Sequence, residues 1–155
     1  MPYLIDFDYE VSRFYGIQIL KSIIMKTVIL AGGYGTRLAE YTDKIPKPMV
    51  QIGDKPILSH IMNFYQSFGY DEFIIAAGYK KNVISEYYKD SKEFKNVKII
   101  DTGEDTMTGG RILRLRSYFE KNENFFMTYG DGLCSINLKR LIQFHLNHKK
   151  IATVT

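Results

Sequence analysis

The stretch from Val28 to Arg37 limits the fold of this chain more than any other part of it. Four apolar residues, Val28 to Ala31, run without alternation into the sequence Gly-Gly-Tyr-Gly-Thr-Arg. Such a run is typical of a strand buried on both faces, as in a parallel sheet. Glycines let backbone N–H groups turn inward around an anion, and an arginine adds a planar charged fork. The stretch therefore predicts a buried strand that delivers a phosphate-binding loop, with a plain tight turn as the alternative.

The spacing within this loop excludes two common phosphate-binding motifs. A P-loop would need Gly-Lys-Ser or Gly-Lys-Thr after the first glycines, and neither follows. The dinucleotide-binding fingerprint would need a third glycine two residues after Gly35, where Arg37 stands instead. A nucleoside triphosphate remains the ligand that we expect here.

Strand-like and helix-like segments alternate along the rest of the chain. The patterns predict strands at 26–31, 49–52, 73–77, 97–101, 124–128 and 151–155, and helices at 56–68, 82–89, 111–120 and 138–147. This alternation predicts a layered α/β domain with a mostly parallel sheet. Ligands bind such sheets at the carboxyl ends of the strands. The glycine loop and residues 78–80, 101–110 and 130–132 all follow predicted strands, so we expect them around one site.

Two charged residues suggest chemistry. Lys47 stands between Pro46 and Pro48, which should hold it on a stiff, extended segment. Asp131 lies between two glycines just after a predicted strand, which suits a magnesium ion that also takes phosphate oxygens and water. The alternatives are a solvated lysine in a proline-rich linker and an ordinary Asp-Gly turn.

Composition narrows the class of protein. The 155 residues are 45% hydrophobic and 25% charged, which is typical of one globular domain. The net charge of +4 suits anionic substrates, but the basic residues are too dispersed to indicate nucleic acid. A single cysteine excludes an internal disulfide and fits a reducing compartment, and no apolar run is long enough to cross a membrane, so we expect a cytoplasmic protein. Residues 1–24 lack clear periodicity, and we interpret them as an N-terminal extension of a domain at 25–155.

Several motifs together resemble the sugar-phosphate nucleotidyltransferase family, and within it the glucose-1-phosphate cytidylyltransferases. The resemblance rests on residues 30–38, 46–49, 52–58, 101–111 and 128–132 and extends from Met25 to Thr155. It implies a three-layer, Rossmann-like nucleotidyltransferase fold. It also implies a reaction in which CTP and glucose 1-phosphate give CDP-glucose, used for polysaccharide biosynthesis, and pyrophosphate.

The resemblance implies a role for each matching residue. Arg37 and Lys47 would be catalytic, and Asp131 would be the first of two aspartates that hold Mg²⁺. The nucleotide would contact Leu30, Ala31, Gly32, Gly33, Gly35, Thr36, Arg37, Lys47, Thr108, Gly109, Gly110 and Arg111. The match ends before the family's second aspartate and much of its sugar site, so the fold is expected to be truncated. Alternatives are another nucleotide or sugar phosphate, or a nucleotide-binding domain without catalysis; a homo-oligomer is compatible with all of them.

Overall fold

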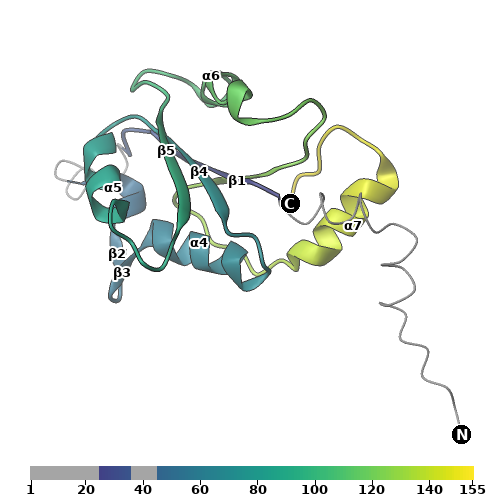
Figure 1. The fold of residues 1–155 in the computed structure, drawn as a ribbon, viewed down its shortest axis with the longest axis horizontal. Coiled ribbons are helices and arrows are strands. Elements are labelled where there is room, and N and C mark those ends of the chain that lie inside the picture. Colours follow the sequence, from purple (N-terminus) through teal and green to yellow (C-terminus); the bar gives the residue numbers. More distant parts are fainter. Residues whose placement is uncertain (1–24, 36–44) are drawn as a thin grey trace, which may run out of the picture.

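Four parallel strands form the centre of the protein. The computed structural model describes residues 25–35 and 45–155, and the predicted extension at 1–24 lies outside that range (Figure 1). The sheet has the order β5-β4-β1-β6, with β1 at Thr27–Ala31, β4 at Glu72–Ala77, β5 at Asn96–Asp101 and β6 at Phe126–Tyr129. Every pairing is parallel, with Leu30 of β1 opposite Ala76 of β4 and Tyr129 of β6. The predicted parallel α/β sheet is confirmed.

Alternate side chains of β1 enter two separate hydrophobic cores. Ile29 and Ala31 pack on the face covered by α4 (Ile57–Ser67), α5 (Lys81–Tyr88) and α7 (Leu138–His148). Val28 and Leu30 pack on the opposite face, which is covered by α6 (Thr108–Arg114) and the 3₁₀ turn η3 (Arg116–Tyr118). Figure 1 shows α6 on one side of the sheet and the other three helices on the other side. The result is a three-layer arrangement with β1 buried on both faces, as its unbroken apolar run predicts.

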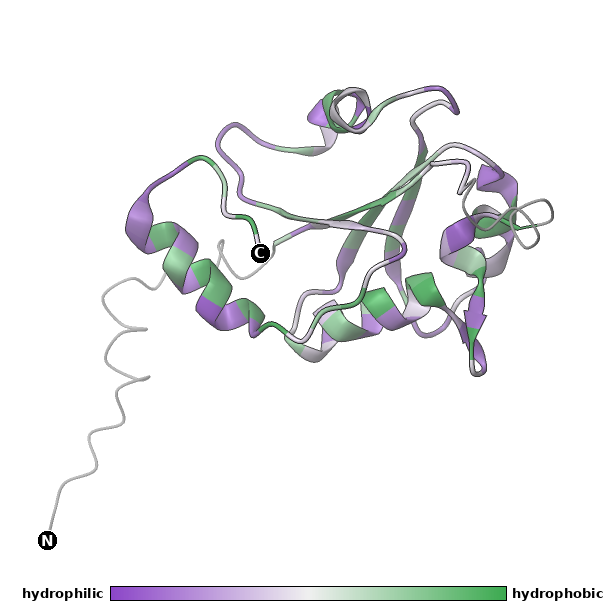
Figure 2. Ribbon diagram, turned by 180° about the vertical axis from the view of Figure 1, so that it is seen from behind, coloured by the Kyte–Doolittle hydropathy of each residue, from purple (hydrophilic) through white to green (hydrophobic). Residues whose placement is uncertain are grey.

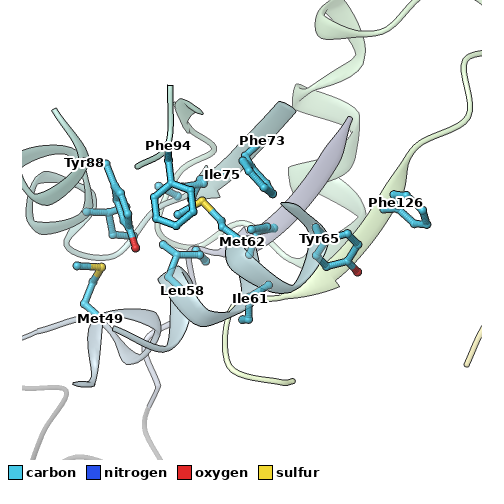
Figure 3. Close-up of a cluster of buried hydrophobic side chains, with 14 of the residues drawn as sticks. Met49, Leu58, Ile61, Met62, Tyr65, Phe73, Ile75, Tyr88, Phe94 and Phe126 are labelled. Carbon is cyan, nitrogen blue, oxygen red and sulfur yellow. The ribbon is translucent and has the colours of Figure 1, made fainter. Parts of the chain in front are cut away.

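The larger core lies between the sheet and α4. Leu58, Ile61, Met62 and Tyr65 of α4 are buried against the sheet, and Figure 3 shows them beside Phe73 and the other large side chains of this core. Figure 2 shows the same segregation along the ribbon, with hydrophobic residues along the central strands and on α4. This packing fixes the sheet edge at which the functional loops emerge.

The segment that carries Lys47 is folded more tightly than predicted. Pro46 is extended, but Lys47–Met49 forms a 3₁₀ turn, η2. The predicted strand at 49–52 is instead a two-stranded hairpin of β2 (Gln51–Ile52) and β3 (Lys55–Pro56). The prolines restrict their own φ and the residue before each, yet Met49 N–H can still donate to Pro46 O at 2.8 Å and close the turn. Lys47 is therefore held by a turn whose Pro48 and Met49 are buried.

Three further expectations differ from the structure. Residues 151–155 form no strand, because no other segment of the described residues pairs with them. Ile151 and Val154 are fully or almost fully exposed. The helix predicted at 111–120 begins at Thr108 and ends at Arg114, where the chain tightens into η3. The helix predicted at 82–89 begins at Lys81 instead, and Lys80, in a left-handed conformation, precedes it without a side-chain cap.

Single residues mark one end of each of two helices. The Asn137 side chain caps α7 by accepting from Arg140 N–H at 3.1 Å. Gly69, with φ +89°, follows the C-cap residue Phe68 of α4, where a glycine commonly ends a helix. In the part of the chain that is described, every helix is too short or too polar to span a bilayer.

Candidate functional site

A cavity of about 560 Å³ opens at the carboxyl ends of the parallel strands. Its walls come from the loop after β1, the loop between β5 and α6, the end of β6 and the η2 turn. The residues that line it are 30–35, 104–108 and 129–131, together with Lys47, Pro48 and Arg111. This is the sheet edge at which ligands bind in parallel α/β folds.

The glycine loop after β1 forms the floor of this cavity. Gly32 stands where a larger residue cannot, because a Cβ there would overlap the Arg111 guanidinium. Its carbonyl oxygen accepts from Tyr79 N–H at 3.2 Å and from Arg111 Nη2 at 2.9 Å. Gly35 adopts φ +67°, a left-handed conformation that favours glycine. The loop is therefore tied to its neighbours through its carbonyl.

Lys47 and Asp131 meet at one side of the cavity. Lys47 Nζ lies 2.5 Å from Asp131 Oδ2, and both side chains are about one-third exposed. The η2 turn and the end of β6 bring them together, since Pro48 packs against Gly130 and Gly130 N–H donates to Leu30 O at 2.9 Å. A pair of opposite charges this accessible is weakly stabilising and can exchange partners with an incoming ion.

Arg111 lies beneath the cavity and holds three loops together. It is 5% exposed, and it donates to five oxygens at 2.7–3.3 Å: those of Gly32, Ala77, Gly103 and Glu104 on the backbone, and Oγ1 of Thr102. All five acceptors are neutral, so burial lowers the pKa of the guanidinium. The resemblance implies that Arg111 contacts the nucleotide, and the structure places Arg111 among the residues that line the cavity.

At the exposed rim of the cavity, a hydrogen bond joins the glycine loop to the loop between β5 and α6. Tyr34 Oη donates to Asp105 Oδ1 at 2.7 Å, and the Tyr34 ring lies 5.1 Å from the Tyr79 ring between centroids. The bond to Asp105 raises the pKa of the Tyr34 hydroxyl, because the carboxylate stabilises the protonated phenol. The β5 loop itself is braced, since Asp101 accepts from Lys81 Nζ at 2.8 Å and from Gly103 N–H at 2.9 Å.

The structure brings most of the predicted site residues together. Those that line the cavity are Leu30, Ala31, Gly32, Gly33, Gly35, Lys47, Thr108, Arg111 and Asp131. Gly109 and Gly110 lie in the first turn of α6 and do not line it. Thr36 and Arg37 lie outside the described residues. Sequence reasoning missed Tyr34, Asp105 and Tyr129, and an aromatic residue between two glycines was the one signal that could have pointed to Tyr34.

The described residues contain no ready-made metal centre. No group of three or more histidine, cysteine, aspartate or glutamate side chains in that part of the chain is arranged to hold a metal ion. The histidines do other things: His60 contacts the Ile52 carbonyl, and His145 and His148 both contact Thr153 Oγ1.

Comparison with known proteins identifies the family. A family model described as nucleotidyl transferase matches residues 26–155. The chain belongs to the nucleotidyl transferase family. The resemblance to nucleotidyltransferases drawn from the motifs is therefore confirmed, and the strand-end cavity lies within the matched domain.

Individual relatives within the family differ in the nucleotide and sugar in their names. Glucose-1-phosphate cytidylyltransferase of Salmonella typhimurium is 45% identical over 153 aligned residues, covering 84% of this chain and 60% of that protein. D-glycero-alpha-D-manno-heptose 1-phosphate guanylyltransferase of Campylobacter jejuni is 41% identical over 128 residues, covering 82% of this chain and 55% of that protein.

A solved structure agrees with the fold. HddC from Yersinia pseudotuberculosis, complexed with GMP-PN, is 35% identical with a TM-score of 0.69, covering 80% of this chain and 55% of that one. The chain thus spans 55–60% of the length of these relatives.

Proposed function

We propose that this chain provides the nucleotide-binding part of a sugar-phosphate nucleotidyltransferase, and that its cavity holds a nucleoside triphosphate. The observation that carries the proposal is the meeting of the glycine loop, the Lys47 ammonium and the Asp131 carboxylate at the ends of β1 and β6. Nucleotidyl transfer needs an anion cradle, positive charge and precise positioning more than a covalent intermediate. These three groups supply those requirements in one place.

Lys47 is proposed to stabilise negative charge that develops on the phosphate oxygens. Its ammonium already lies in the cavity, and its partner Asp131 is accessible enough to release it. A positive charge that is aimed at the reacting phosphate lowers the barrier to transfer, because the charge on the oxygens grows in the transition state. Thr36 and Arg37 remain proposed phosphate contacts on the evidence of the motif alone.

Asp131 is proposed to hold Mg²⁺. The Asp131 carboxylate in the cavity wall fits this ion, which usually binds proteins through one or two carboxylates and completes its coordination with phosphates and water. When bound, Mg²⁺ would neutralise charge on the triphosphate. The part played by the chain itself is to present the Asp131 carboxylate beside the glycine loop.

CTP and glucose 1-phosphate are the proposed substrates. The support is the 45% identity to a glucose-1-phosphate cytidylyltransferase. In the proposed reaction an oxygen of the sugar phosphate bonds to the α-phosphorus of CTP. The bond from that phosphorus to the bridging oxygen breaks, and pyrophosphate leaves with the electron pair. Because a guanylyltransferase is also 41% identical to this chain, the alternative is that the chain uses another nucleotide or sugar phosphate.

A pyrophosphate-release assay tests the proposal. The 155-residue chain is incubated with Mg²⁺, glucose 1-phosphate and, in separate reactions, CTP, UTP, dTTP, ATP or GTP. Release with CTP alone is the expected result, and release with a different nucleotide alone would overturn the choice of CTP.

A second candidate function is nucleotide binding without turnover. The observation that favours it is coverage, since the chain spans only 60% of the cytidylyltransferase to which it is 45% identical. Calorimetric binding of CTP by a chain that releases no pyrophosphate would select this function.

A further inference from the structure

Tyr34 belongs to the glycine loop, and its side-chain contacts lie on the side of the loop away from the Lys47–Asp131 pair. Its ring contacts Tyr79, just after β4, and its hydroxyl contacts Asp105, in the loop after β5. Asp131, in contrast, follows β6. Because the sheet order is β5-β4-β1-β6, the Tyr34 contacts and the ion pair lie on either side of β1.

This arrangement gives the cavity two chemically different ends. Neighbouring strands lie about 4.8 Å apart, so β5 and β6, three spacings apart, are separated by roughly 14 Å. One end holds the Lys47 ammonium and the Asp131 carboxylate, which suit phosphates and metal. The other end holds the Tyr34 ring beside Asp105 and Thr106. A ligand that contacts both ends must be elongated, with an anionic part and a flat or polar part.

The Tyr34 ring is held at two points before any ligand arrives. The bond to Asp105 fixes the hydroxyl end, and the contact with Tyr79 supports the ring. Tyr34 nevertheless remains 41% exposed and lines the cavity. A rigid, accessible aromatic ring is a good stacking surface, because little conformational freedom is lost when a flat group packs on it.

We propose that Tyr34 is the residue against which the nucleobase stacks, with Tyr79 and Asp105 holding its ring in place. The inference rests on the proposed nucleotide site and adds the element that reads the base end of the ligand. The base lies on the β4 and β5 side of the glycine loop, and the phosphates extend toward Lys47. Tyr34 thereby contributes to the binding of nucleotides and makes no contribution to the binding of pyrophosphate, which has no base.

Replacing the ring separates these two ligands. Tyr34→Leu keeps an apolar side chain but removes the aromatic face, and base–aromatic stacking predicts about 5- to 100-fold weaker CTP binding. Pyrophosphate affinity should stay within about twofold. Tyr34→Phe keeps the ring and loses only the bond to Asp105, so its CTP affinity should fall by a few-fold at most. Tyr87→Leu, at an exposed tyrosine of α5 that does not line the cavity, is the matched control.

A spectroscopic variant tests the contact directly. The chain contains no tryptophan, so Tyr34→Trp places a single tryptophan, which can be excited selectively, at the proposed stacking position. CTP should quench its emission saturably, because the base lies on the indole, and pyrophosphate should leave the emission almost unchanged.

The outcomes separate this inference from the proposed function. Selective loss of CTP affinity in Tyr34→Leu, with quenching by CTP alone in Tyr34→Trp, supports the stacking role. Equal loss of CTP and pyrophosphate affinity, or no loss of either, overturns it while leaving the nucleotide site intact. A wild-type chain that binds neither ligand overturns the proposed function and this inference with it.

Discussion

Replacement of Arg111 by methionine should destabilise the protein more than any other single change in the site. Methionine matches the apolar stem of arginine but cannot donate a hydrogen bond. Five oxygens would each lose a donor, and Arg111 is only 5% exposed, so water cannot easily replace it. Gly32 O and Ala77 O would keep the backbone donors Tyr79 N–H and Thr102 N–H. The glycine loop would lose the bond from Arg111 Nη2 to Gly32 O.

The expected loss follows from the number and burial of these bonds. A buried acceptor left unpaired costs about 1–3 kcal/mol, but the costs of neighbouring groups do not add, and single substitutions rarely exceed about 5 kcal/mol. Removal of the buried charge itself avoids a desolvation cost. We therefore expect Arg111→Met to lower the free energy of unfolding by about 3–5 kcal/mol. Arg111→Lys, with three donors for five acceptors, should lose about half as much.

Urea denaturation followed by circular dichroism measures this difference. At a slope of about 2 kcal/mol per molar, Arg111→Met should lower the midpoint by roughly 2 M. Arg116→Met, at an exposed arginine of η3 in the same region, is the control and should shift the free energy by less than about 0.5 kcal/mol. A loss below about 1 kcal/mol for Arg111→Met would refute the view that this guanidinium holds the three loops together.

Three other predictions concern the site and its support. Lys47→Ala should cut turnover by orders of magnitude and weaken CTP binding much less, because the lysine charge acts mainly in the transition state. Steady-state rates and calorimetric CTP affinities measure the two effects, and an unchanged rate would contradict the role of Lys47. Asp131→Asn should abolish activity together with its dependence on Mg²⁺, and a metal titration identical to wild type would disprove that role. Asp101 has a pKa below its usual 3.8 because Lys81 and the Gly103 N–H bond its carboxylate. Its contribution to stability is therefore present above pH 3.8 and lost as the pH falls through the lowered pKa, so the stability difference between wild type and Asp101→Asn, measured in urea at pH 6 and pH 3, should shrink on acidification.

Much of the fold could be predicted because its signals are local. The buried strands are unbroken apolar runs, such as Val28 to Ala31, and each described helix begins beside a proline, glycine or asparagine. The strand predicted at 151–155 failed because a strand exists only with a partner. Nothing in Ile151 or Val154 reveals whether one is present.

The site was only partly predictable, for a physical reason. Asp131 could be placed near the glycine loop because parallel strands end at a common edge, whereas the η2 turn that brings Lys47 to Asp131 was not predicted. The structural role of Arg111 could not be seen, since its acceptors include the carbonyls of Gly32 and Ala77, which no sequence pattern marks. The position of Tyr34 between two glycines does not show that its ring packs against Tyr79, because that contact depends on how β1 and β4 pair.

Binding of CTP to the 155-residue chain is the most direct test of the account. Isothermal titration calorimetry in the presence of Mg²⁺ should give one saturable site, which pyrophosphate competes for and which Asp131→Asn weakens. Gly32→Val provides the structural counterpart, because its side chain would overlap the Arg111 guanidinium beneath the loop, and it should lose binding. The absence of any saturable heat with CTP or the other nucleoside triphosphates would contradict the assignment of this cavity as a nucleotide site.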